Sequence, residues 1–140
     1  MTDPRWAAEV ELSPAFHDLD PMEIVWHGHY VKYLELARCA LLAQIDYDYP
    51  QMRASGYAWP VVDLRLKFVR PARYAEPFRL RAVIVEWENR LKIQYLAREL
   101  ATGAKLTQGH TIRVAVEIAS GEMCYETPPV LWQKLGLEPP

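Results

Sequence analysis

Four segments in which apolar and polar residues alternate, joined by short linkers, limit the folds open to this chain more than any other feature of its sequence. They cover residues 61–70, 78–88, 90–100 and 110–118. An alternation with a period of two predicts strands that bury one face. Because the linkers are short, consecutive strands are expected to pair as antiparallel hairpins. A similar alternation over residues 10–16 predicts a first strand, which Pro14 places at an edge or a bulge.

The longest apolar segment, residues 30–45, has helical spacing. Its apolar residues recur at intervals of three and four: Tyr30, Leu34, Ala37, Leu41 and Ile45. Few positions are left for solvent, namely Lys32, Glu35, Arg38 and Gln44. A helix this apolar is expected to cover the apolar side of the sheet. The sequence therefore predicts an α+β fold, with one long central helix wrapped by a curved antiparallel sheet of about five strands. Residues 128–135 predict a short terminal helix.

Length and composition place the chain among ordinary globular proteins. Its 140 residues fit a single domain, 1–140, whose size supports a core without disulfides. A net charge of −2 disfavours nucleic acid as a partner. No apolar run approaches the length of a membrane span. Asp3, Pro4 and Glu9 stand where a signal peptide needs apolar residues, and Cys39 and Cys124 are too few for a disulfide framework. We therefore expect a soluble, cytoplasmic protein.

The residues with catalytic potential lie between the first strand and the helix. This stretch contains His17, Asp18, Asp20, His27 and His29. The start of a helix has unpaired N–H groups and the positive end of the helix dipole, which suit a carbonyl oxygen. Histidine and carboxylate also suit zinc or iron, but the spacing matches no strong metal motif. Asp20 precedes Pro21, which is equally typical of a turn.

The sequence of this stretch resembles the corresponding motif of the hotdog-fold thioesterases. The resemblance rests on Asp18-Leu-Asp20-Pro21, Ile24-Val25-Trp26-His27, Tyr30 and Leu34-Glu35-x-Ala37-Arg38, with a supporting block at Phe68–Tyr74. It extends from about Val10 to Ile118 and is nearest to the 4-hydroxybenzoyl-CoA thioesterases and the thioesterases of Tol–Pal gene clusters. It implies hydrolysis of an acyl-CoA or acyl-carrier-protein thioester without a metal or other cofactor. It also implies a homodimer or homotetramer with each site at a subunit boundary.

The resemblance assigns roles to individual residues. In those families the second Asp of the Asp-x-Asp pair is the catalytic carboxylate, which corresponds to Asp20. It would act as a general base, or as a nucleophile that forms an anhydride. The backbone N–H at the position of His27 polarises the thioester carbonyl, and the Tol–Pal group also has a His side chain there. Further substrate contacts are expected at Trp26, Gly28, His29, Tyr30, Arg70 and Arg73.

Two positions depart from the family pattern. Glu23 stands where the family usually has Gly, and His29 stands where it often has an Asn or Ser that caps the helix. Glu23 brings a second carboxylate near the site and leaves the local backbone path open. A non-catalytic module that binds acyl thioesters is therefore one alternative. A hotdog-fold dehydratase or hydratase that uses His27 with Glu23 or Glu35 is another.

Charged residues outside the motif have plainer interpretations as well. Arg65, Lys67, Arg70 and Arg73 form a basic stretch, which either anchors the phosphates of coenzyme A or is the solvated face of a strand. Glu35 is expected to be structural, paired with Arg38 or with a neighbouring strand. Aromatic, short-chain and medium-chain acyl groups are all compatible with the sequence.

Overall fold

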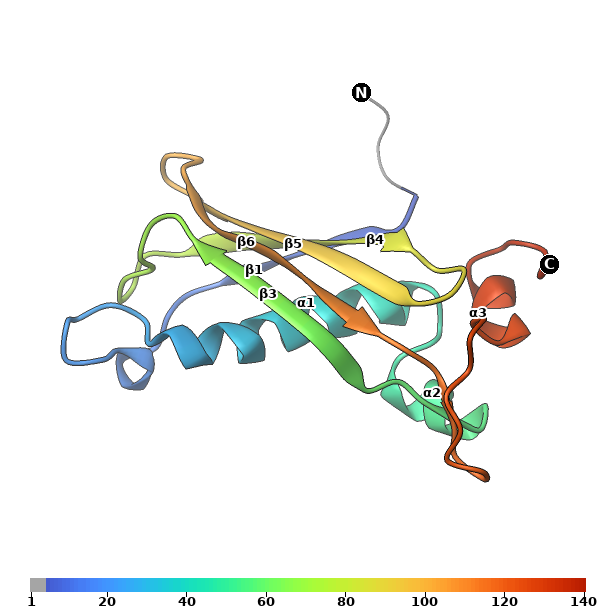
Figure 1. Cartoon of the computed structure of the whole chain (residues 1–140). Coiled ribbons are helices and arrows are strands. Elements are labelled where there is room, and N and C mark those ends of the chain that lie inside the picture. The colour runs from blue at the N-terminus through green and yellow to red at the C-terminus, as the bar shows by residue number, and fades with distance from the viewer. Residues whose placement is uncertain (1–4) are drawn as a thin grey trace.

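The computed structural model describes residues 5–140 and consists of a five-stranded antiparallel sheet with one long helix lying across one face (Figure 1). Asp3 and Pro4 lie outside the described residues. The sheet order is β1-β4-β5-β6-β3, and the helix is α1, Tyr30–Gln44. The strands are β1 (Ala7–Leu12), β3 (Val61–Phe68), β4 (Phe78–Glu86), β5 (Leu91–Glu99) and β6 (Lys105–Arg113). The predicted α+β architecture is confirmed.

The smaller elements lie around this frame. Two 3-10 turns, Phe16–Asp18 and His27–His29, precede α1. Helix α2 (Tyr49–Ala54) and the expected terminal helix α3 (Pro129–Lys134) lie beyond the far end of α1 (Figure 1). Strands β2 (Tyr57–Ala58) and β7 (Val116–Glu117) form a separate two-stranded sheet. Within residues 5–140, no helix is both long enough and apolar enough to cross a membrane.

The core lies between α1 and the concave face of the sheet. The helix contributes Leu34, Ala37, Leu41 and Leu42, all fully or almost fully buried. Alternate residues of β4 and β5 face them, among them Leu80, Ala82, Ile84, Leu91 and Ile93. Burying each large aliphatic side chain stabilises the fold by about 1.5–3 kcal/mol. This layer fixes α1, and therefore holds the start of α1 against the end of the sheet.

Two predicted strands have different limits in the structure. The strand expected over residues 110–118 ends at Arg113, because Val114 N–H donates to the Pro60 carbonyl and the chain then turns away to pair with β2. The first strand begins at Ala7 and ends before Pro14, and the side chain of Phe16 is exposed instead of buried. In both segments the apolar alternation continues past the last residue that pairs within the five-stranded sheet.

Arg38 is buried, whereas the spacing of α1 placed it in solvent. Its Nε donates to Glu35 at 2.9 Å, as expected for this pair, and its Nη1 donates to Asp48 at 2.7 Å. Glu35 also accepts from Arg113 Nη2 at 2.6 Å. The two carboxylates compensate the guanidinium charge that burial removes from water.

The apolar face of β3 is uncovered, although the alternation predicted that it would be buried. The side chains of Val62, Leu64 and Phe68 are 57%, 42% and 48% exposed. The cause is that α1 packs against β1 and β4, at the opposite edge of the sheet, and leaves the edge strand β3 largely uncovered. Among residues 5–140, no element pairs with its outer edge. The strand pattern is therefore correct, but this chain supplies no cover for it.

Candidate functional site

Asp20 lies at the tip of a tight turn whose backbone is closed by its own hydrogen bonds. Leu19 and Val25 form an antiparallel bridge. Asp20 N–H donates to the Ile24 carbonyl at 2.8 Å, and Glu23 N–H donates to the Asp20 carbonyl at 2.9 Å. One carboxylate oxygen of Asp20 accepts from Met22 N–H at 2.8 Å. Its other oxygen has no hydrogen-bond partner among residues 5–140, so it is available to a ligand.

A cavity of about 260 Å³ opens beside this turn. It brings together four residues that the sequence singled out: Asp20, His27, Tyr30 and Arg70. Its walls are largely apolar, and Phe68 supplies one of them. The Tyr30 and Phe68 rings lie 5.0 Å apart, and Tyr30 Oη accepts from Ala72 N–H at 3.3 Å. These contacts join the second sequence block to the start of α1.

The helical N-terminus beside Asp20 is at His27. The 3-10 turn His27–His29 runs directly into α1, and His29 has helical dihedral angles with no side-chain cap. No acceptor for the His27 N–H is present in the described part of the chain. An unpaired N–H at the positive end of a helix dipole is suited to hold the oxygen of a polarised carbonyl group.

The other predicted substrate contacts are not in the cavity wall. Trp26 is exposed, and its ring covers Gly28 so closely that a Cβ atom at Gly28 would clash with it. The Trp26 and His29 rings lie 5.3 Å apart, and Arg73 is exposed. Trp26, Gly28, His29 and Arg73 therefore lie outside the cavity wall, and their contact with substrate remains a prediction.

A buried carboxylate behind the turn is the feature that the sequence did not reveal. Asp18 is 3% exposed and accepts from Tyr33 Oη at 2.6 Å, Lys32 Nζ at 2.9 Å and Ala15 N–H at 3.1 Å. Burial acts to raise the pKa of Asp18, but these hydrogen bonds and the Lys32 charge hold that pKa well below its ordinary value. Burial and the bond to Asp18 raise the pKa of Tyr33. Asp18 therefore ties the turn to α1 as an anion at neutral pH.

Glu23, where the family usually has Gly, has a left-handed backbone with φ of 64°. A residue with a Cβ pays roughly 1–2 kcal/mol for this conformation. We expect Glu23→Gly to raise the free energy of unfolding by up to about 1 kcal/mol, after the greater entropy of Gly in the unfolded chain is subtracted. Urea unfolding measures the change. Glu23→Ala keeps the Cβ and should give no gain, whereas an equal gain from Ala would show that the Glu side chain, not φ, is the cause.

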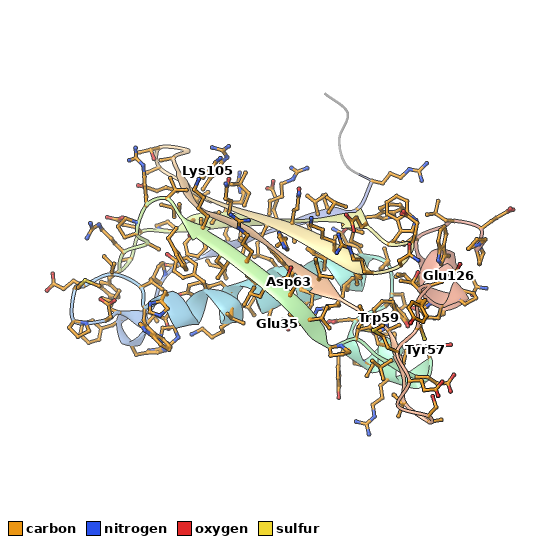
Figure 2. The ribbon with its side chains drawn as sticks, viewed as in Figure 1. Glu35, Tyr57, Trp59, Asp63, Lys105 and Glu126 are labelled. Atoms are coloured by element: carbon orange, nitrogen blue, oxygen red, sulfur yellow. The ribbon has the colours of Figure 1, made fainter. Side chains whose placement is uncertain are left out.

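Glu35 lines a different cavity from His27. That cavity, about 520 Å³, is lined by Trp59, Arg113 and residues of α2. Figure 2 labels Glu35 and Trp59. Both oxygens of Glu35 are bound by arginines, as described above. The structure therefore does not bring the pair of a dehydratase, His27 with Glu35, into one site. Within residues 5–140, no group of three or more His, Cys, Asp or Glu side chains is arranged to hold a metal ion.

Comparison with known proteins identifies the family of this chain. Residues 14–135 match the thioesterase-like superfamily. A Synechocystis protein provisionally named an esterase is 30% identical over 142 residues, which cover 96% of this chain and 81% of that protein. A Bacillus subtilis protein provisionally named an acyl-CoA thioesterase is 31% identical over 77 residues, 55% of this chain and 53% of its own length.

Solved structures share the fold across most of the chain. A hypothetical protein from Thermus thermophilus is 29% identical with a TM-score of 0.79, covering 91% of this chain and 96% of its own. A 4-hydroxybenzoyl-CoA thioesterase variant complexed with 4-hydroxybenzoyl-CoA is 18% identical with a TM-score of 0.80, covering 93% and 99%. The latter comparison supports the fold alone. The match over residues 14–135 decides the family: this chain belongs to the thioesterase-like superfamily and is a thioester hydrolase of the hotdog fold.

Proposed function

We propose that the protein hydrolyses acyl-CoA thioesters, with Asp20 as general base or nucleophile and the His27 backbone N–H as oxyanion donor. The observation that supports this is the meeting of the Asp20 carboxylate and the His27 turn in one cavity at the start of a helix. The reaction needs no more than these two groups and water. Acyl-carrier-protein thioesters are the second substrate class, since they present the same reacting bond.

Asp20 can complete thioester hydrolysis either as a general base or as a nucleophile. As a base, Asp20 takes a proton from water while the water oxygen bonds to the carbonyl carbon. The carbonyl oxygen becomes an oxyanion that accepts the His27 N–H, an interaction worth about 2.7–4 kcal/mol at a preorganised site. The C–S bond then breaks, and the thiolate leaves with the proton. As a nucleophile, Asp20 displaces the thiolate, and water hydrolyses the resulting anhydride.

The cavity favours a compact acyl group. About 260 Å³ is below the usual range of roughly 300–1,000 Å³ for small-molecule sites, and Tyr30 and Phe68 offer aromatic contact. Structural neighbours include proteins named as 4-hydroxybenzoyl-CoA, 1,4-dihydroxy-2-naphthoyl-CoA and gentisyl-CoA thioesterases. Free-thiol release from a panel of aromatic, short-chain and medium-chain acyl-CoAs tests the proposal. Fastest thiol release from aromatic or short-chain acyl-CoAs would support the proposal. If thiol were released neither from any acyl-CoA of the panel nor from acyl-carrier-protein thioesters, the proposal would be overturned.

The remaining predicted roles complete the proposal. Arg70 lines the cavity and would bind a phosphate or polar group of the substrate, while Trp26, Gly28, His29 and Arg73 would contact it outside. We also propose a cytoplasmic location, with which the free thiols of Cys39 and Cys124 are compatible.

We further propose a homodimer, or a tetramer built from it, that covers the exposed apolar face of β3. An uncovered edge strand with apolar residues is suited to pair with another chain. Phe68 belongs both to this face and to the wall of the Asp20 cavity, so a partner here would help to enclose the site.

Leu64→Lys should dissociate this dimer, because the substitution would place a charge in the contact. Light scattering after gel filtration measures the mass at micromolar concentration, and thiol release should fall with it. Val85→Lys is the matched control on the opposite face of the sheet, and it should leave the dimer intact. A native chain that is monomeric in the same experiment would refute the proposal.

A further inference from the structure

A groove of about 600 Å³ lies on the outer face of the sheet, on the side away from α1. Four basic side chains and one histidine line it: Arg65, Lys67, Arg81, Lys105 and His110. No acidic residue is among the residues that form its walls. The catalytic proposal uses none of these side chains.

Strand alternation and register create the groove. Along β3, Leu66 and Phe68 face α1, so Arg65 and Lys67 face outward. Arg65 lies opposite His110, and Lys67 lies opposite Gln108 on β6. The basic stretch recognised in the sequence is thereby divided, since Arg70 lines the Asp20 cavity while Arg65 and Lys67 face the other side.

The groove retains most of its positive charge. Arg65 and Lys67 have no carboxylate within 4.0 Å among residues 5–140. Lys105 Nζ donates to the neutral Gln108 amide at 3.0 Å. Arg81 is paired with Glu9 at 3.3 Å, so it contributes less. His110 Nε2 lies 3.6 Å from an Asp63 carboxylate oxygen.

We propose that this groove binds the phosphorylated nucleotide end of the coenzyme A substrate. The proposal rests on the proposed function. The volume falls within the range of small-molecule sites, which favours a nucleotide over a protein surface. Several unshared cations match several phosphates. The amides of Gln94 and Gln108 can hydrogen-bond a base or ribose, and Val83 and Leu96 offer apolar contact.

The groove and the Asp20 cavity lie on opposite faces of the sheet, and neighbouring residues of β3 line both of them. Lys67 directly precedes Phe68, which lines the cavity. The Leu106 carbonyl accepts hydrogen bonds from both Val69 N–H and Arg70 N–H. These bonds hold the backbone next to Lys105 against the backbone of Arg70. Lys105 lies at the end of the sheet near the start of α1, opposite the end that carries Tyr57 and Trp59 (Figures 1 and 2). The long flexible arm of coenzyme A would pass this end beside Arg70.

The test compares two thioesters with the same acyl group, one on coenzyme A and one on pantetheine, which lacks the nucleotide. The double variant R65Q/K67Q should raise KM for the acyl-CoA about tenfold or more, with kcat unchanged. KM for the acyl-pantetheine should not change. K92Q/R98Q removes the same charge from β5 outside the groove and should leave both KM values unchanged.

A direct binding measurement separates this proposal from the catalytic one. Adenosine 3′,5′-bisphosphate, titrated calorimetrically into the native chain, should bind, and R65Q/K67Q should weaken that binding by a similar factor. This result would support the groove even if no thioester were hydrolysed. An unchanged KM for the acyl-CoA, an equal rise for both thioesters, or no binding of the bisphosphate to the native chain would each overturn it.

Discussion

Replacing Asp20 with Asn lowers kcat for thioester hydrolysis by at least about 100-fold, the effect expected on losing a general base or nucleophile. Asn keeps the size of the side chain and an oxygen that can accept the Met22 N–H, so the turn should persist. Only the negative charge is lost. Free-thiol release from the best acyl-CoA of the panel measures the change, and circular dichroism checks that the fold is retained.

Glu23→Gln is the matched control for this experiment. It neutralises a neighbouring carboxylate that is exposed and does not line the cavity. Its rate should stay within about twofold of the native rate, because Gln keeps the size of the side chain and the Cβ atom, and an exposed side chain outside the cavity contributes little. If D20N released thiol at the native rate, Asp20 would be a turn residue and no more. A large loss in E23Q alone would transfer the catalytic role to Glu23.

Replacing Asp18 with Asn is expected to lower the free energy of unfolding by about 1.5–3 kcal/mol, the range for hydrogen bonds to a charged group. The amide cannot replace the anion that holds both Tyr33 Oη and Lys32 Nζ. Since Asp18 ties the Asp20 turn to α1, the rate of hydrolysis should fall as well. Urea unfolding measures the stability. Asp46→Asn, which removes an exposed partner of Lys134, should change it by less than about 0.5 kcal/mol.

The contribution of Asp18 should depend on pH with a definite sign. The pKa of Asp18 is lower in the folded chain than its ordinary value of 3.8, so the folded state favours the anion. The stabilisation is therefore complete above that ordinary value and is lost as the pH falls below it. The difference in stability between the native chain and D18N should stay constant from about pH 7 to pH 5 and shrink below about pH 4. A difference that grows on acidification would show that Asp18 is not held as an anion.

Local patterns in the sequence were sufficient for the elements and for the first members of the site. Alternation with a period of two depends on the geometry of a single strand, so it located β3 to β6. Spacing of three and four located α1 in the same way. The resemblance in the stretch before α1 placed Asp20 and His27 together, and the structure puts both in one cavity. Their chemical roles stay predictions.

Contacts between distant segments could not be predicted in this way. The hydrogen bond between Asp18 and Tyr33 on α1 depends on how the turn packs against that helix. Arg38 is buried because Asp48, beyond the end of the helix, folds back to it.

The amino-acid sequence by itself determined which residues form strands and helix, which side chains share a face, and which carboxylate stands before the helix. Only the tertiary structure decided which of those faces are covered. Periodicity describes one element, whereas burial depends on what packs against it, so Val62 and Leu64 have the pattern of a core face and yet lie exposed on an edge strand. For the same reason, the basic stretch is continuous in sequence but is divided between two sides of the sheet.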